Sequence, residues 1–385
     1  MWAGCPRPIS HFPFLISIMS RFQQRRNRLR QTLKSQGVSA LLVTNFTNVA
    51  YLTGFTGGDS YLLLHAGGEV LLSDTRYELQ IAEECPGLDA QIRETAASLL
   101  EMAAKNIVKT GGNKCLGVES GTLTLKQRDA LAEQLPHWAI HGLEDSVESL
   151  RMIKDKYEIE SLRKAVKAAV KGFELIRCGL TPEQTEIEIR NDLEYAMRRF
   201  GADDKSFNTI VAVGPRAALP HAVPTTKRVE EAELLLVDWG AKCEGYISDL
   251  TRTLITSSKP SQKLRKMYEA VLTAQKQALA AIKPGEIMDN VDRVARKSLE
   301  DAGYGKLFTH GLGHGLGLEV HDGKRFCPGS QTVLQPGMVM TVEPGVYIGG
   351  WGGIRIEDDV LITKDGCEIL SSTLGKEFDE MMGST

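Results

Sequence analysis

Four acidic residues stand inside apolar stretches that otherwise have the pattern of β-strands. They are Asp238, Asp249, Glu343 and Glu357, and the runs around them read ELLLVDWG, YISDLTRTLI, MVMTVEPG and IRIEDDVLI. Aspartate in particular is disfavoured in strands. These four misfits therefore mark the strands of the second half of the chain as the region to be explained first.

The length and the charge of the chain limit what it can be. Its 385 residues are 42% hydrophobic, which is enough for a sizeable core and too many for one domain of ordinary size, so we expect two domains. The formal net charge is only -3 and there is no basic block, which argues against a nucleic-acid partner. No apolar run is long enough to span a membrane, and the ligand is expected to be small.

The order of the sequence patterns predicts where the two domains lie. Residues 20–150 alternate helical and strand patterns, among them ALLVTN, YLLLH, EVLLSD and KCLGVES, and predict an α/β domain. Residues 151–385 begin with a long charged helical pattern and predict an α+β domain. Within it, Thr181–Gln184 has the composition of a capping box and predicts a helix that ends near Gly201. A helix pair is expected over residues 261–303.

Residues 1–19 form an extension in front of the first domain. Phe12–Met19 is a short apolar run, but no small-x-small cleavage site follows it and the next residues are polar and basic, which argues against a signal peptide. We expect a disordered extension, or a start codon placed too early with Met19 as the working start. The seven cysteines are scattered and include no C-x-x-C pair, which favours a reducing compartment, the cytoplasm.

Residues 233–256 have the pattern of two strands joined by a turn. If the turn is a four-residue loop, Ala241 pairs with Tyr246, and counting outward places Asp238 directly opposite Asp249. Two carboxylates at that distance repel each other unless a cation lies between them, and such rigid oxygen ligands suit Mn²⁺, Zn²⁺ or Co²⁺ better than Ca²⁺. The alternative is that one aspartate caps a turn and faces water.

Three of the eight histidines of the chain gather in the glycine-rich stretch 309–322, THGLGHGLGLEVHD. They are His310, His314 and His321. The stretch has too many glycines for a stable helix, and glycine lets the backbone approach a ligand closely. A single histidine is more often a core residue than a ligand, but three together favour a binding or catalytic site.

Residues 338–362 contain two strand patterns around a glycine-rich turn. Alternation of side chains places Glu343 on one face of the first strand, and Arg355, Glu357 and Asp359 on one face of the second. Arg355 is therefore placed to orient Glu357 or to neutralise part of the charge. A surface ion pair is the alternative for Glu357 taken alone.

Together these stretches supply four carboxylates and one imidazole, enough ligands for two metal ions when carboxylates bridge. Two such ions can hold a hydroxide between them and polarise a scissile carbonyl, which makes hydrolysis the natural reaction. No G-x-S-x-G elbow, P-loop or strand-borne G-x-G-x-x-G is present in the sequence. The candidate metal ligands are Asp238, Asp249, His314, Glu343 and Glu357.

The order of these motifs closely resembles the pita-bread metallopeptidases: an aspartate, a second aspartate eleven residues later, HGLGHGLGLEVHD, TVEPG and GIRIEDD. Within that family the chain looks like the Xaa-Pro peptidases, aminopeptidase P and prolidase. Residues 48–55 (NVAYLTGF), 73–80 (SDTRYELQ) and 206–225 (SFNTIVAVGPRAALPHAVPT) also resemble theirs. The resemblance extends from about residue 20 to the C-terminus. It implies a creatinase N-terminal-like domain followed by a pita-bread catalytic domain.

The resemblance also implies roles for single residues. Two divalent ions, with Mn²⁺ expected, would be held by the five ligands, of which Asp249 and Glu357 bridge. Glu343 would in addition carry the proton from the nucleophile to the leaving nitrogen. His221 and His321 would bind substrate and stabilise the tetrahedral intermediate. His310 and Arg355 would line or support the pocket. Thr251 would orient a metal ligand.

Short peptides with proline at the second position are the implied substrates, and a homodimer is implied because the N-terminal domain of the family often completes a neighbour's site. Apart from Arg355, no separate basic residue lies between Glu343 and Glu357 that would grip a dipeptide's C-terminal carboxylate, which argues against strict dipeptidase activity. Asp322 stands where many relatives have glutamate. Two alternatives remain, an inactive pita-bread binding module and a creatinase-like hydrolase that needs no metal, and the intact ligand set argues against both.

Overall fold

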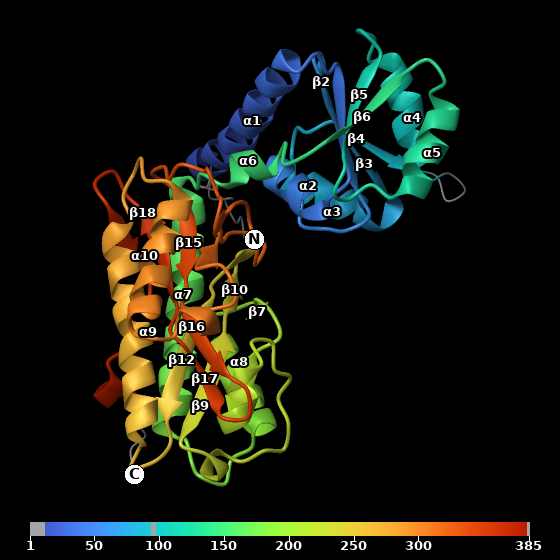
Figure 1. The fold of residues 1–385 in the computed structure, drawn as a ribbon. Helices are drawn as coiled ribbons and strands as arrows, with labels where there is room; N and C mark the ends of the chain where they lie inside the picture. The colour runs from blue at the N-terminus through green and yellow to red at the C-terminus, as the bar shows by residue number, and fades with distance from the viewer. Residues whose placement is uncertain (1–11, 94–97, 383–385) are drawn as a thin grey trace, which may run out of the picture. The chain divides into compact units, whose positions relative to one another are not determined.

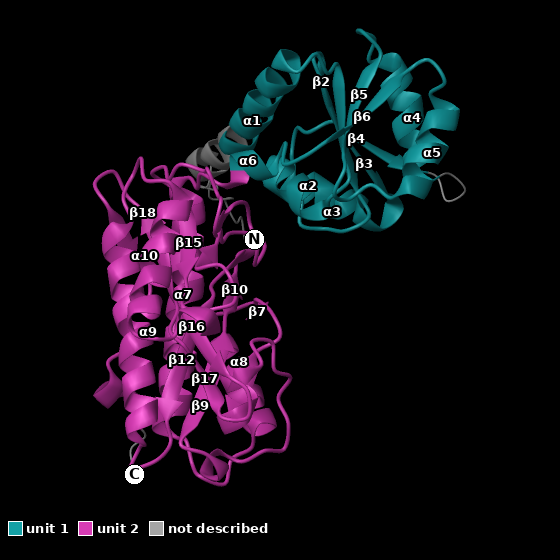
Figure 2. Cartoon of the chain, in the orientation of Figure 1, with its two compact units in different colours: residues 1–150 teal, residues 151–385 magenta. Residues whose placement is uncertain are grey.

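The chain folds into two compact units, drawn in separate colours in Figure 2. The computed structural model describes residues 12–93 and 98–382. The first unit contains residues 1–150 and the second contains residues 151–385. Within the described ranges, no helix has the length and apolar character needed to cross a lipid bilayer.

The first unit is a mixed β-sheet with helices packed on it (Figure 1). In chain order its main elements are α1 (Phe12–Ser35), β1 (Ala40–Val43), α2 (Phe46–Thr53), β2 (Tyr61–His65), β3 (Gly68–Asp74), α3 (Glu78–Glu84), β4 (Ala90–Arg93), α4 (Leu99–Lys109), β5 (Cys115–Glu119), α5 (Leu125–Gln134), β6 (Ala139–Leu143) and α6 (Glu148–Arg151). The strands lie in the order β4-β3-β2-β1-β5-β6. Strand β2 is antiparallel to both neighbours, whereas β1, β5 and β6 are parallel.

The four strand patterns predicted in this unit are confirmed as β1, β2, β3 and β5. Their inward side chains pack against α4 and α5, as Leu42, Leu116, Ile107 and Leu131 do in one buried cluster. Of the expected extension, residues 12–19 have helical backbone at the start of α1, and residues 1–11 lie outside the described ranges.

The second unit combines short sheets with four long helices. In chain order its main elements are α7 (Lys156–Cys178), α8 (Glu186–Arg199), β7 (Asp204–Lys205), β8 (Ile210–Val213), β9 (Leu234–Trp239), β10 (Ala241–Cys243), β11 (Tyr246–Ile247), β12 (Leu250–Ile255), α9 (Gln262–Ala281), α10 (Met288–Asp301), β13 (Gly313–His314), β14 (Arg325–Phe326), β15 (Val339–Val342), β16 (Gly345–Ile348), β17 (Gly352–Arg355), β18 (Asp358–Ile362) and β19 (Cys367–Ile369). The expected helix pair over residues 261–303 is confirmed as α9 and α10.

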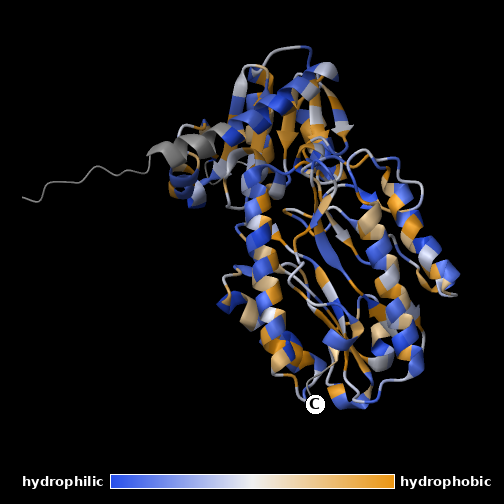
Figure 3. Cartoon of the chain, turned by 90° about the vertical axis from the view of Figure 1, so that its left-hand side faces the viewer, coloured by the Kyte–Doolittle hydropathy of each residue, from blue (hydrophilic) through white to orange (hydrophobic). Residues whose placement is uncertain are grey.

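The helices of the second unit pack as two pairs on the strands between them (Figure 1). Helices α7 and α8 contact each other and β7, β8, β10 and β11, whereas α9 and α10 contact each other and β14 to β17. Hydrophobic and hydrophilic residues alternate along the long helices in Figure 3, so each helix has an apolar face to bury. At the centre of the common core, Trp239 stacks on Phe173 with ring centroids 4.2 Å apart.

Strands β10 and β11 are joined by a two-residue turn, so the predicted four-residue loop is wrong. Tyr246 pairs with Cys243, whereas a four-residue loop would have paired it with Ala241. Glu244 and Gly245 have φ angles of 52° and 85°, the left-handed values that a two-residue turn of type I′ requires. A glutamate in this conformation gave no signal in the sequence, because such turns usually begin with asparagine, aspartate or glycine.

The shorter turn shifts the pairing of the outer strands by two residues. Asp238 on β9 lies opposite Thr251 on β12, not opposite Asp249 as predicted. Because side chains alternate with a period of two, a shift of two residues leaves both aspartates on one face. The strands meet tightly here, since a Cβ added at Gly240 would lie 1.8 Å from the carbonyl oxygen of Ser248.

Helix α8 begins four residues later than predicted. Thr181–Gln184 forms a turn whose backbone carbonyls accept hydrogen bonds from residues 229–230. The N-cap is Thr185, whose hydroxyl accepts from the Glu188 amide, while the Glu188 carboxylate accepts from the Thr185 amide at 2.8 Å. The sequence contains two successive capping signatures, Thr181–Gln184 and Thr185–Glu188. The backbone of the first is hydrogen-bonded to residues 229–230, so the helix begins at the second.

Candidate metal centre

The sequence predicts a metal-binding or catalytic role for nine residues, and all nine line one cleft of the second unit. Thr251, for which only a supporting role is predicted, is not part of the lining. The cleft has a volume of about 880 Å³. Its walls come from segments that are far apart in the sequence, so the fold has gathered residues that the motifs only suggested belong together. The nine are His221, Asp238, Asp249, His310, His314, His321, Glu343, Arg355 and Glu357.

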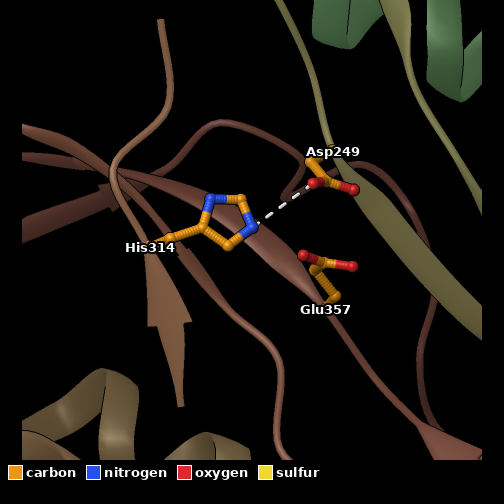
Figure 4. Close-up of side chains that lie close together, drawn as sticks. All are labelled: Asp249, His314 and Glu357. Atoms are coloured by element: carbon orange, nitrogen blue, oxygen red, sulfur yellow. Dashed lines mark ion pairs between the residues drawn. The ribbon is translucent and has the colours of Figure 1, made fainter. Parts of the chain in front are cut away.

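Asp249, His314 and Glu357 form the centre of this site. Each offers one ligand atom, and these atoms lie within 4.8 Å of one another. Figure 4 shows the two carboxylates side by side with the imidazole pointing toward them, and His314 Nε2 is 3.5 Å from Asp249 Oδ2. All three residues are buried. They come from the residue before β12, from β13 and from the gap between β17 and β18.

The ring of His314 is held so that Nε2 is free to act as a ligand. Its Nδ1 lies 3.1 Å from the carbonyl oxygen of Gly315, which can only accept, so Nδ1 carries the proton. The His314 amide donates to Thr341 Oγ1 at 3.0 Å. A Cβ added at Gly313 would lie 2.1 Å from the Thr341 carbonyl oxygen. Glycine therefore allows β13 to approach β15 and to aim Nε2 at the carboxylates.

Glu343 and Asp238 complete the acidic cluster. Glu343 Oε1 is 3.5 Å from His314 Nε2 and accepts a hydrogen bond from Thr341 Oγ1 at 3.3 Å. Asp238 Oδ2 accepts a hydrogen bond from Arg355, whereas its Oδ1 is buried and has no hydrogen-bond donor among the described residues. A buried carboxylate oxygen without a donor is costly, and a bound cation would satisfy it.

Glu343 and Glu357 both lie in short gaps between consecutive strands. Glu343 lies between β15 and β16, and Glu357 lies between β17 and β18. As the alternation of side chains predicts, Arg355, Glu357 and Asp359 all reach toward the segment of β9 and β12. The backbone at both positions is still hydrogen-bonded, since the Glu343 amide donates to the Leu312 carbonyl oxygen at 2.8 Å and the Glu357 amide to that of Thr251 at 3.1 Å.

Arg355 orients Glu357 through Thr251 and not by direct contact. The Arg355 Nε donates to Thr251 Oγ1 at 3.0 Å, and the Thr251 hydroxyl donates to Glu357 Oε2 at 2.6 Å. The hydroxyl can do both because it has one proton to give and two lone pairs. Thr251 thus fixes the direction of a candidate ligand, as second partners of metal ligands do.

Arg355 is also connected to His310 through Tyr347, a residue that the sequence prediction missed. Arg355 Nη1 lies 2.8 Å from Tyr347 Oη, which lies 3.0 Å from His310 Nε2. Since His310 Nδ1 faces the Gly311 carbonyl oxygen at 2.8 Å, Nε2 is the acceptor of the tyrosine proton. Tyr347 is four residues after Glu343 and could have been assigned to the same strand face.

His321 and His221 lie on the open side of the site. The His321 ring packs edge-on against His314 with centroids 4.4 Å apart. His221 is exposed, and its ring makes no hydrogen bond to any described residue. Its place in the cleft is therefore set by the backbone of the loop that carries it.

Burial shifts the pKa values of the cluster strongly. It raises the pKa of Asp249 and of Glu357 well above the ordinary value, and the neighbouring carboxylates raise both further. Burial also raises the pKa of Glu343 to about 8 and lowers the pKa of His314 to about 4, which leaves a neutral imidazole. Crowded buried oxygens beside a neutral imidazole are a donor set that fits divalent metal ions.

Arg325 lines the same cleft and was also missed. It lies on β14 opposite His314 on β13, and it is exposed. Its guanidinium has no ion pair or hydrogen bond within the described part of the chain. A prediction of two short paired strands within residues 313–326 would have placed Arg325 beside His314.

Comparisons with known proteins identify the family of the chain. Residues 160–364 match the model of metallopeptidase family M24, and residues 25–153 match that of the creatinase/prolidase N-terminal domain. A protein named Xaa-Pro dipeptidase from Pyrococcus furiosus is 36% identical over 352 residues, which are 91% of this chain and 98% of that protein.

Solved structures show the same two-domain architecture. The Xaa-Pro dipeptidase from Bacillus anthracis superposes with a TM-score of 0.89 at 36% identity, covering 94% of this chain and 99% of its own. The X-Pro aminopeptidase from Thermotoga maritima gives 0.83 at 34% identity, covering 92% and 99%. The predicted fold, an α/β domain followed by a pita-bread catalytic domain, is thereby confirmed. The chain belongs to metallopeptidase family M24 and carries the creatinase/prolidase type of N-terminal domain.

Proposed function

We propose that this metallopeptidase hydrolyses the bond between a first residue and proline at the N-terminus of short peptides. The observation that carries the proposal is the buried trio Asp249, His314 and Glu357, whose ligand atoms lie within 4.8 Å of one another at the wall of a cleft of about 880 Å³. Such a cleft accommodates a small peptide. The proline preference is supported by the relatives, which are named Xaa-Pro dipeptidase or X-Pro aminopeptidase.

Two divalent ions, with Mn²⁺ favoured, are proposed to be held by the five ligands. The oxygen-rich donor set and the donor-free Asp238 Oδ1 support this assignment. When bound, such ions supply an acidified water as nucleophile and polarise the scissile carbonyl. The ligands are Asp238, Asp249, His314, Glu343 and Glu357.

The remaining side chains are proposed to handle the proton and the substrate. Glu343 is the most exposed of the four carboxylates, with 17% of its side chain accessible, so it can take a proton at the cleft and deliver it to the proline nitrogen as the C–N bond breaks. His221 and His321 face the open side and are placed to bind substrate and steady the tetrahedral intermediate. Arg355 holds Asp238 and, through Thr251, Glu357.

A panel of peptides tests the proposal. With Mn²⁺, Co²⁺ or Zn²⁺ added, we expect release of the first residue from Xaa-Pro dipeptides and Xaa-Pro-Yaa tripeptides and much slower cleavage of Xaa-Ala controls. The products are measured by mass spectrometry. Cleavage of Xaa-Pro substrates at an unchanged rate after complete metal removal by a chelator would contradict the proposal and favour a creatinase-like mechanism.

Arg325 favours dipeptides among these substrates. Its unpaired guanidinium in the cleft is suited to grip a C-terminal carboxylate, a role for which the stretch between Glu343 and Glu357 offers no basic residue other than Arg355. A dipeptide presents that carboxylate on the proline itself, whereas a longer peptide presents a neutral amide there.

Replacing Arg325 by methionine is therefore expected to raise KM for a Xaa-Pro dipeptide by about 10- to 100-fold, the value of one charge-assisted bond. KM for the same dipeptide with an amidated C-terminus should change little. Arg190→Met is the matched control, because Arg190 also lines the cleft but is hydrogen-bonded to Asn191. An equal rise in KM for the free and the amidated peptide would show that Arg325 does not bind the C-terminal carboxylate.

Two further proposals concern the state of the protein. Every described cysteine is free, which supports a reducing compartment such as the cytoplasm. The homodimer remains a prediction from the family resemblance. Sedimentation of the purified chain would give its mass in solution.

A further inference from the structure

The loop over residues 213–225 carries His221 into the cleft, and Glu186 lies at its base. Glu186 is the first residue of α8, and its side chain is 0% exposed. It does not line the cleft, whereas Pro220 to Pro224 do. The sequence pattern assigned no role to this carboxylate.

The Glu186 carboxylate fastens both ends of the loop. Its Oε1 accepts from the Val213 amide at 2.8 Å, and its Oε2 accepts from the Thr225 amide and hydroxyl, both at 2.7 Å. Both oxygens lie 3.0 Å from Arg216 Nε. One buried side chain thus receives hydrogen bonds from the first, fourth and last residues of the loop.

The same carboxylate acts near the tip of the loop through Arg216. The guanidinium of Arg216 also donates a hydrogen bond to the Val223 carbonyl oxygen. Val223 is two residues from His221, whose own ring has no hydrogen bond to a described residue. The position of the imidazole therefore depends on the backbone that this chain of contacts holds.

We infer that Glu186 is a positioning residue that sets the place of His221 in the cleft, an inference that rests on the proposed function for the effect on catalysis. Replacement by glutamine keeps the shape but turns one oxygen into an amide nitrogen, which faces only N–H donors in place of Oε1 and two N–H donors beside the Thr225 hydroxyl in place of Oε2. The loop then shifts. A displacement of about 1 Å in a group that contacts substrate can cost about 100-fold in rate.

The test is a double-substitution cycle. Glu186→Gln is expected to lower kcat/KM for a Xaa-Pro substrate by about 10- to 100-fold in the wild-type chain, and by less than about 3-fold when His221→Ala is already present, because coupled residues are not additive. Metal content should be unchanged, since the metal ligands lie on other segments. Equal losses in both backgrounds, or no loss at all, would overturn the inference.

Two controls separate positioning from stability. Glu188→Gln makes the same chemical change two residues along α8 at an exposed capping carboxylate, and should leave kcat/KM unchanged. If Glu186→Gln does not fold, Thr225→Val removes one bond at the end of the loop and enters the same cycle. It is expected to show a smaller loss with the same dependence on His221.

A measurement without substrate keeps the inference separate from the proposed function. The chain has only eight histidines, so ¹³C-labelled imidazole signals can be resolved and the His221 signal identified by its absence in His221→Ala. The chemical shift of the His221 signal should change in Glu186→Gln and remain unchanged in Glu188→Gln. An unmoved signal overturns the inference. A moved signal in a protein that does not cleave Xaa-Pro peptides would leave the positioning intact and reject the proposed function.

Discussion

Replacing Asp249 by asparagine is expected to abolish metal binding at the centre of the cleft and to lower kcat/KM on the order of 1,000-fold, because a metal ion supplies several kcal/mol and each 1.4 kcal/mol is tenfold in rate. Asparagine keeps the shape but replaces a charged oxygen 3.5 Å from His314 Nε2 by a neutral one or by a nitrogen. Metal content by mass spectrometry and steady-state kinetics with a Xaa-Pro peptide provide the measurement.

The control for this substitution is Asp365→Asn, the same chemical change at an exposed turn of the same unit. It should leave metal content and kinetics unchanged. Wild-type rates in metal-free Asp249→Asn would contradict the assignment of this residue as a ligand and the dependence of the reaction on metal.

The metal-free form of Asp249→Asn should be more stable than the metal-free wild-type protein at pH 7. Burial first, and then Glu357, raise the pKa of Asp249 well above its ordinary value. An acid whose pKa is raised on folding stabilises the fold below the pKa of the unfolded chain, about 4, and this contribution is lost as the pH rises. Asparagine carries no charge, so thermal unfolding of the metal-free variant should depend less on pH.

The largest loss of stability is expected from Arg252→Met. The Arg252 side chain is 0% exposed and pairs with Asp358 at 2.7 Å, and it also donates to the carbonyl oxygens of Glu357, Leu374 and Gly375. Removing one partner of a buried ion pair costs about 3–5 kcal/mol of unfolding free energy, because the remaining charge stays buried. Lys376 still contacts Asp358 and keeps the loss from being larger.

Urea unfolding of the metal-free proteins measures this loss. Lys297→Met is the control, since Lys297 and Asp301 form an ion pair in which each side chain is more than 60% exposed, and its loss should cost less than about 1 kcal/mol. A similar value for both variants would show that the buried arginine is compensated by repacking and contributes no more than a surface charge.

The sequence was sufficient to predict which residues gather in the cleft because these residues conflict with their local pattern. Asp238 and Asp249 stand in apolar strand runs, and three histidines gather in a glycine-rich stretch, so each local anomaly marked a residue that the fold brings to one cleft. The two-domain fold was predictable for the opposite reason, because most of the chain follows clear strand or helix periods of hydrophobic residues.

The errors came from contacts between separate segments and from one unusual backbone conformation. The start of α8 was misplaced because residues 229–230 pair with the first of two capping signatures, and local composition cannot show that. The register of β9 and β12 was wrong because Glu244 adopts a left-handed conformation that its residue type does not suggest. Arg325 was missed because its neighbour His314 lies eleven residues away on a paired strand.

The loop at residues 213–225 is fastened to α8, whereas the proposed metal ligands stand on or beside the strands β9, β12, β13, β15 and β18. Mutation and selection can therefore act on the two parts separately. Changes between the fixed ends of the loop, apart from His221, are expected to alter which peptides are accepted and to leave the proposed metal ligands in place. This arrangement offers a physical basis on which one ancestral hydrolase could diversify into enzymes with different substrates, and it gives a protein engineer a defined segment to randomise.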